Sequence, residues 1–160
     1  MKTKFLYSLL FVTVFSHSTT LNVSFTGVLA VSPPECTING ATTTDINFGD
    51  IHETLIDGSY KKMLIDYELN CTKIYNNALK MTLNWNSITI NGKDTVRTNR
   101  DNLGIAIYHN NTLITNGSII NFQYNSDNPL LYAVPVKPNG MTLQDGGNFT
   151  GTITMLIDYS

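Results

Sequence analysis

Hydrophobic and polar residues alternate with a period of two along most of the chain, the pattern of β-strands with one buried face. The first two runs have their apolar residues in phase at Met63, Ile65, Tyr67, Leu69 and Cys71, and at Leu79, Met81, Leu83 and Trp85. Three more runs follow at Leu103, Ile105 and Ile107, at Leu130, Tyr132, Val134 and Val136, and at Phe149, Ile153, Met155, Ile157 and Tyr159. We predict that each set faces the interior.

Turn-forming dipeptides separate these runs. They are Asn39-Gly40, Asp57-Gly58, Asn91-Gly92, Asn116-Gly117, Asn139-Gly140 and Gly146-Gly147. No segment of useful length has helical spacing. An earlier strand is expected to begin at Cys36 and to continue through Ile38 towards Ile46 and Phe48. About seven short strands with turns between them predict an all-β fold, a β-sandwich in one domain.

The first twenty residues differ from the rest of the chain. Lys2 and Lys4 precede an apolar run over residues 5–15, and the small residues Ser16 and Ser18 follow. This order is typical of a secretory signal peptide. A buried helix or a membrane anchor is the alternative, but the run is shorter than the roughly twenty residues that span a bilayer. We predict a signal peptide over residues 1–18, cleaved between 18 and 20, and hence an exported protein.

Export gives meaning to the two cysteines, Cys36 and Cys71. An oxidising compartment favours a disulfide between them. The alternative is metal binding, but two isolated thiols without nearby histidines make a poor zinc site. We therefore predict a structural disulfide and no metal or other cofactor.

Composition limits the function classes. Hydrophobic residues make up 42% of the chain and charged residues 14%, which is the opposite of a disordered chain. The formal net charge is −2 without a lysine or arginine cluster, so no nucleic-acid partner is expected. Catalysis is not expected either, because only His52 and His109 follow the signal peptide and neither belongs to a recognisable nucleophile motif. The nearby aspartates are more typical of turns; these are Asp45, Asp50, Asp57 and Asp66.

The segment before Cys36 does not fit a self-contained fold as well as the later runs do. Its apolar residues alternate with polar ones at Leu21, Val23, Phe25 and Leu29, with Gly27 in the apolar phase. Pro33 and Pro34 then interrupt any strand ladder. The segment is either the first strand of the sandwich or a strand that contacts another backbone, since a glycine in the buried phase favours close approach.

Several stretches resemble subunits of the chaperone–usher fimbriae of Gram-negative bacteria, close to the minor, tip-associated pilins of the P-pilus type. The similarity covers the whole mature chain and depends on the order and spacing of its motifs. These are residues 23–27, 34–38, 48–51, 67–71, 103–107 and 133–136, with Gly147 thirteen positions before the end and Tyr159 penultimate.

The resemblance implies an immunoglobulin-like sandwich that lacks its last strand and is completed by a strand from a neighbour. Residues 19–34 would be the N-terminal extension and residues 35–160 the pilin domain. The donated residues would be Leu21, Val23, Phe25, Gly27 and Leu29. The strand at the edge of the groove, which the chaperone would bind, would contain Gly147, Ile153, Met155, Ile157 and Tyr159.

The partners implied are a periplasmic chaperone, an outer-membrane usher and neighbouring subunits, in a fibre at the cell surface that supports adhesion as a minor or adaptor pilin. The resemblance leaves open an initiator, major or terminator role. One rival interpretation is a single-domain carbohydrate-binding adhesin, although Trp85 in phase with Leu83 indicates a core residue. Another is a secreted glycoprotein, but the five Asn-x-Ser/Thr sequons are expected by chance in a chain this rich in Asn, Ser and Thr.

Overall fold

The computed structural model describes residues 20–38 and 45–160. The chain divides into two units, Met1–Val31 and Ser32–Ser160, which are described separately. The predicted signal peptide and the Asn39-Gly40 turn lie outside the described residues. Within them, no helix has the length and apolar character needed to cross a membrane.

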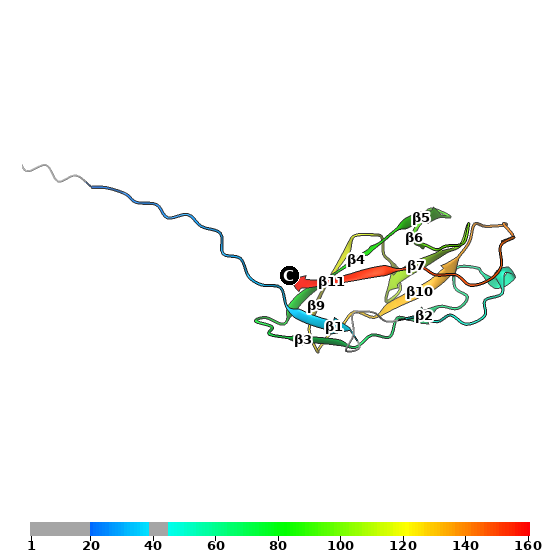
Figure 1. Cartoon of the computed structure of the whole chain (residues 1–160), viewed down its shortest axis with the longest axis horizontal. Helices are drawn as coiled ribbons and strands as arrows, with labels where there is room; N and C mark the ends of the chain where they lie inside the picture. The colour runs from blue at the N-terminus through cyan, green and yellow to red at the C-terminus, as the bar shows by residue number, and fades with distance from the viewer. Residues whose placement is uncertain (1–19, 39–44) are drawn as a thin grey trace, which may run out of the picture. The chain divides into compact units, whose positions relative to one another are not determined.

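In the described part of the second unit, the regular secondary structure is all β-strand apart from one short 3₁₀ helix (Figure 1). The elements are β1 (Glu35–Ile38), the short 3₁₀ helix η1 (Glu53–Leu55), β2 (Met63–Leu64), β3 (Leu69–Thr72), β4 (Ala78–Trp85), β5 (Ser87–Ile90), β6 (Lys93–Arg97), β7 (Gly104–His109), β8 (Thr112–Leu113), β9 (Ser118–Gln123), β10 (Leu131–Val136) and β11 (Ile153–Tyr159). The predicted all-β class is confirmed.

The strands form three sheets, and every pair is antiparallel. The largest has the order β2-β10-β7-β6-β5, with β8 paired to β7; the second has the order β11-β4-β9; and β1 pairs with β3. The main core lies between the two larger sheets, because buried side chains of β4 and β9 pack with those of β7 and β10. This is a sandwich of two layers, with β1 and β3 at one margin.

The alternation predicted for β4 is confirmed. Leu79, Met81 and Leu83 have no exposed surface and Trp85 is 8% exposed. The Asn91-Gly92 turn is also confirmed: both residues have positive φ, 51° and 74°, and they join β5 to β6 as a two-residue hairpin. That backbone conformation is why Asn-Gly is favoured there.

The single strand predicted over residues 63–71 is wrong, although its inward phase is right. Ile65 and Leu69 are buried, but β2 pairs with β10 while β3 pairs with β1. The chain therefore leaves one sheet and enters another between these two strands. The amide of Ile65 still donates to the Leu131 carbonyl at 2.8 Å, just after β2 ends.

The inward phase predicted for β10 is only partly right: Val134 and Val136 are buried, at 1% and 3% exposure, but the phase does not face the main core. Leu130 is 52% exposed, whereas Leu131 and Ala133 belong to the main core. Val136 packs in a second, small cluster with Ile90 and Ala106. Because β10 lies between β2 and β7 and is covered on both faces for most of its length, its sequence carries no simple alternation.

The expected continuation of β1 through Ile46 and Phe48 is not a strand in the described residues. Phe48 is buried and Ile46 half-buried, but residues 45–52 form no ladder. The Asn47 side chain accepts the amide hydrogen of Gly49 at 2.8 Å, and Gly49 has φ +62°. This local turn diverts the chain towards η1.

Candidate functional site

The most unusual feature of the sandwich is the incomplete cover of β11. On one face of their shared sheet, Ile153, Met155, Ile157 and Tyr159 stand directly opposite Trp85, Leu83, Met81 and Leu79. The β4 members are buried, but all four β11 members remain half-buried. In the described residues β11 pairs only with β4, so it is an edge strand.

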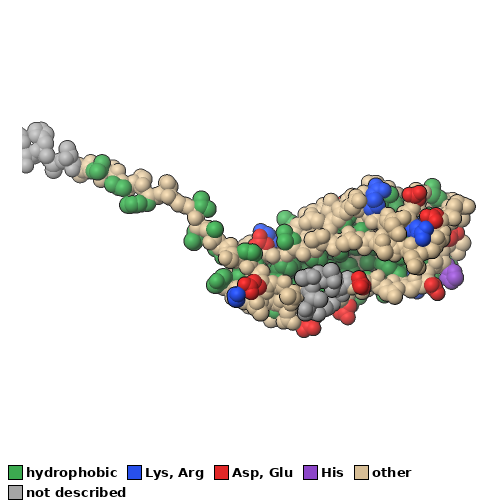
Figure 2. Space-filling model, in the orientation of Figure 1, with side chains coloured by type: hydrophobic (Ala, Val, Ile, Leu, Met, Phe, Trp, Pro, Cys, Tyr) green, Lys and Arg blue, Asp and Glu red, His purple; other side chains and the backbone are tan. Residues whose placement is uncertain are grey.

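The opposite wall of this opening comes from early parts of the chain. Cys36 and Ile38 of β1 are half-buried against the main core, as are Ile46 and Ile51. In Figure 2 a sunken band of hydrophobic side chains runs beside β11 on the side of β1. We call this band, which lies between β11 and β1, the groove.

The disulfide predicted between Cys36 and Cys71 is present and joins β1 to β3. Further fixing comes from Tyr67, whose hydroxyl donates to the Pro129 carbonyl at 2.6 Å. Burial raises the pKa of Tyr67 to about 12, so this hydroxyl is protonated at neutral pH. These contacts hold the wall opposite β11 in place.

The backbone of β11 directs hydrogen-bonding groups at the groove. The Ser160 amide donates to the Ala78 carbonyl, so this opposed pair is hydrogen-bonded. Hydrogen-bonded and non-bonded pairs alternate along an antiparallel ladder. Ile153, Met155, Ile157 and Tyr159 therefore point their N–H and C=O groups away from β4. The same residues point their apolar side chains into the groove and their unpaired backbone groups towards its edge.

Aromatic side chains make contacts at both ends of β11. Phe149, just before β11, packs on Phe48 with ring centroids 5.8 Å apart. At the other end the Tyr159 hydroxyl accepts the Tyr75 amide hydrogen at 3.1 Å and lies 3.5 Å from the Lys73 carbonyl.

The loop over residues 137–152, which leads into β11, is held by ion pairs and hydrogen bonds to two other segments of the chain. The Lys137 ammonium lies 2.7 Å from the Glu53 carboxylate, which also accepts the Leu143 amide hydrogen at 3.3 Å. The Lys137 hydrogen bond, followed by that of Leu143, lowers the pKa of Glu53. Arg100 binds the Asp145 carboxylate at 2.7 Å and the Asn148 carbonyl at 2.8 Å.

The residues predicted for the groove edge are brought together with one exception. Gly147 lies in the loop before β11 and not in the strand. Its φ is +111°, and a β-carbon there would lie 2.7 Å from an Arg100 guanidinium nitrogen. The glycine therefore allows the arginine to reach the Asn148 carbonyl beside it.

The first unit is described between residues 20 and 31, where it has no secondary structure. Its apolar side chains are largely exposed: Leu21 87%, Val23 63%, Phe25 93%, Leu29 90% and Val31 61%. No atom lies within 4 Å of the β-carbon position at Gly27. The alternating segment thus contributes nothing to a hydrophobic core within the described structure of its own unit.

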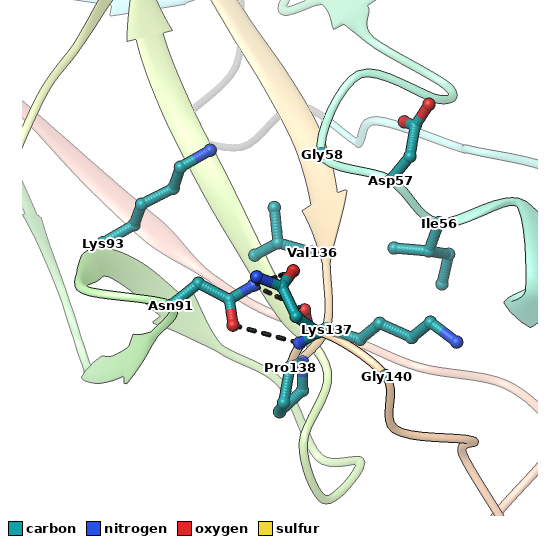
Figure 3. Close-up of a pocket in the computed structure, with 10 residues that line it drawn as sticks. Ile56, Asp57, Gly58, Asn91, Lys93, Val136, Lys137, Pro138 and Gly140 are labelled. Atoms are coloured by element: carbon teal, nitrogen blue, oxygen red, sulfur yellow. Dashed lines mark hydrogen bonds between the residues drawn. The ribbon is translucent and has the colours of Figure 1, made fainter.

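A second depression lies at the tip of the β5–β6 hairpin (Figure 3), lined by residues 56–58, Asn91, Lys93 and 136–140. The Asn91 side chain donates to the Lys137 carbonyl and accepts the Asn139 amide hydrogen. Because these polar groups are already bonded to the protein, the depression is a structural joint between two turns.

The two histidines in the described part of the chain lie at the surface or near it. His52 is exposed before η1. His109 is half-buried at the end of β7, and its ring nitrogen Nε2 lies 3.4 Å from the side-chain nitrogen Nδ2 of Asn110. No group of three or more His, Cys, Asp or Glu side chains in the described part of the chain could hold a metal ion. Trp85 is a core residue, as predicted, and its indole nitrogen lies 3.4 Å from Asp94.

Sequence reasoning missed three residues that shape the groove: Phe48 and Phe149 as a pair, and Asp158. The aromatic contact joins positions about a hundred residues apart, and no local pattern predicts it. Asp158 had a signal, because it is the only charged residue between residues 146 and 160.

The sequence is similar to that of known fimbrial proteins. The family model described as "Fimbrial protein" matches residues 23–160. Two fimbrial-like proteins of Escherichia coli K12 are similar. YfcR is 38% identical over 135 residues, which is 82% of this chain and 77% of that protein. YfcQ is 30% identical over 163 residues, 99% of both chains.

Two solved structures share the fold. The P pilus adaptor subunit PapF matches with a TM-score of 0.59 and 24% identity over 81% of this chain and 98% of its own. The P pilus rod subunit PapA matches with a TM-score of 0.59 and 20% identity over 81% and 100%. The sandwich is therefore the incomplete immunoglobulin-like fold of these pilus subunits.

Proposed function

Because this chain belongs to the fimbrial protein family, we propose that it is a structural subunit of a bacterial fimbria that polymerises by exchange of β-strands. Its groove would accept one strand, and its residues 21–29 would fill the groove of the next subunit. Strand addition to an exposed sheet edge is a general mode of recognition, and the assembly of pilins is itself one of its known examples.

The observation that carries this proposal is the half-buried face of β11 beside an open ladder. An apolar face that is half-covered, next to unpaired N–H and C=O groups, favours association with another strand. An added strand would bury the side chains of Ile153, Met155 and Ile157 and pair with their backbone at the same time.

The N-terminal segment has the complementary properties. Leu21, Val23, Phe25 and Leu29 are exposed in their own unit, and their period-two spacing places them on one face of an extended strand. Full burial of three or four such side chains contributes about 6–10 kcal/mol before ordering costs. Gly27 in the same phase would fit where the neighbouring backbone comes closest.

The partners and place proposed for this subunit are those that the resemblance to chaperone–usher fimbrial subunits implies. We propose a periplasmic chaperone that covers the groove along β11 before assembly, an outer-membrane usher, and neighbouring subunits in a cell-surface fibre. The role proposed is that of a minor or adaptor subunit that supports adhesion; the name of PapF describes that protein as an adaptor. On this proposal the chain performs no catalysis.

Two arginine substitutions on adjacent residues test the donor role. Phe25→Arg places a charge on the apolar face of the donated strand, whereas Ser24→Arg places the same charge on the polar face. We expect Phe25→Arg to reduce incorporation into fibres at least tenfold, because a desolvated charge is costly. Ser24→Arg should assemble at close to the normal rate.

The measurement is the amount of this subunit in purified fibres, with chaperone binding as the control for folding. Deletion of residues 20–29 should likewise retain chaperone binding and lose the capacity to donate. Normal fibre incorporation of either the deletion variant or Phe25→Arg would exclude the donor role.

A further inference from the structure

The open edge of β11 is not uniform along its length. Three of its four groove-facing residues, Ile153, Met155 and Ile157, have no partner for their outward amide hydrogens among the described residues. Tyr159 differs, because the Asp158 carboxylate accepts its amide hydrogen at 2.8 Å. The last position on the ladder is therefore already occupied by a side chain of the same strand.

The Tyr159 amide points towards the open edge of the sheet. Ser160 and Ala78 form a hydrogen-bonded pair, so Tyr159 must point away from β4. The hydrogen bonds at the two ends of the β4–β9 pair are consistent with this. The Leu83 carbonyl accepts the Gly117 amide hydrogen, and the Tyr124 amide donates to the Asn77 carbonyl. The backbone N–H and C=O groups of odd-numbered β4 residues thus point towards β9. Those of odd-numbered β11 residues point towards the open edge of the sheet.

The position of the Asp158 side chain is itself fixed. Asp158 stands opposite Lys80 on the outer face of the sheet, with 3.8 Å between carboxylate and ammonium. One carboxylate oxygen lies near Lys80 while the other takes the Tyr159 amide hydrogen. It is also the only charged side chain on β11, whose other outward residues are Thr154 and Leu156.

The side chain of Tyr159 closes the same end independently. Its hydroxyl is bonded to the Tyr75 amide, and the two tyrosine rings are 6.4 Å apart. A strand entering the groove would meet this aromatic contact where it would also meet the Asp158 carboxylate. Two separate sets of contacts therefore end the groove at Tyr159.

We infer that Asp158 sets the limit of strand pairing in this groove and so determines the register of the accepted strand. This inference rests on the proposed strand exchange. To pair with the Tyr159 amide, a carbonyl of the incoming strand must displace a carboxylate, which forms the stronger, charge-assisted hydrogen bond. The carbonyl oxygen, which carries a partial negative charge, must also come close to the negatively charged carboxylate. Pairing therefore covers the amides of Met155 and Ile157 and stops before Tyr159.

Amide hydrogen exchange of the isotope-labelled chain, with and without an unlabelled peptide of residues 20–34, tests this inference. The peptide should slow exchange at Met155 and Ile157 at least tenfold. Exchange at Tyr159 should already be slow without peptide and should change less than twofold when peptide is added. In Asp158→Ala, Tyr159 should exchange about tenfold faster without peptide and should then gain protection with it.

Two matched variants separate the contribution of the Asp158 acceptor oxygen from that of its ion pair with Lys80. Asp158→Asn retains the acceptor oxygen and should keep partial protection of Tyr159. Lys80→Gln removes the ion pair alone and should leave the Tyr159 amide protected. Slow exchange at Met81 and Leu83 in every variant shows that the sheet is folded.

The outcomes distinguish the two proposals. If Met155 and Ile157 gain no protection, the strand-accepting function is wrong. Met155 and Ile157 could gain protection while Tyr159 also gains at least tenfold protection in the wild-type chain, or while Tyr159 exchanges at the same rate in wild type and Asp158→Ala. Either result would mean that Asp158 does not limit the register, and only the strand-accepting function would stand.

Discussion

Strands β4 and β11 are neighbours in one sheet and turn apolar residues to the same inner face, yet these residues differ in burial. Met81 of β4 has no exposed surface, while Met155 of β11 is half-buried on the same face. The difference lies in the neighbours: in the described residues β4 has a strand on each side and β11 has one. A sequence pattern identifies the face that turns inward, but the number of neighbouring strands decides how completely that face is covered.

The largest expected effect comes from truncating the same residue type on each strand. Met81→Ala removes a fully buried side chain and should lower the free energy of unfolding by about 3 kcal/mol. Met155→Ala should lower it by only about 1 kcal/mol, since water already reaches that side chain. Urea denaturation of the two variants measures both values.

The peptide of residues 20–34 sharpens this test. When it fills the groove, Met155 becomes a core residue and the cost of Met155→Ala should approach that of Met81→Ala. Equal costs without peptide would show that β11 is covered as fully as β4, and the contrast between the two strands would be lost.

A smaller effect is expected at low pH, in the loop that leads into β11. The bonds from Lys137 and the Leu143 amide lower the pKa of Glu53 below its usual 4.5. A lowered carboxyl pKa in the folded state gives stability that is present above pH 4.5 and lost as the pH falls through the folded-state value. The Leu143 amide should therefore exchange faster in acid, relative to the intrinsic rate.

Glu53→Gln should remove that acid dependence at Leu143. Asp57→Asn is the control, because the pKa of Asp57 is also lowered, but by hydrogen bonds within its own turn from Ser59 and Tyr60. Amides of β4 should show no such dependence in any variant. The same acid dependence in wild type and Glu53→Gln would mean that Glu53 does not hold the loop.

The sequence predicted the parts of the fold that depend on local patterns. The inward faces of β4 and β11, the Asn91-Gly92 hairpin and the Cys36–Cys71 bond needed only alternation, turn chemistry and an oxidising compartment. The phase of β10 could not be read in the same way, because a central strand covered on both faces has no polar side to mark it.

The groove itself was expected only from the resemblance to fimbrial subunits. No alternation shows that a strand is absent, since a missing neighbour leaves no trace in the residues beside it. The aromatic contact before β11 could not be predicted for a related reason: the Phe48–Phe149 pair depends on how distant segments meet in three dimensions.

Methionine oxidation tests the central claim, that the uncovered side of β11 accepts a strand, without any mutation. When the chain is treated with dilute peroxide and followed by peptide mass spectrometry, Met155 should oxidise in the free chain and at least tenfold more slowly with the peptide of residues 20–34. Met81, which is fully buried, should resist oxidation in both states, and Met141, 40% exposed in the loop before β11, should react in both. If Met155 is as resistant as Met81 from the start, or stays reactive with peptide bound, the claim is contradicted.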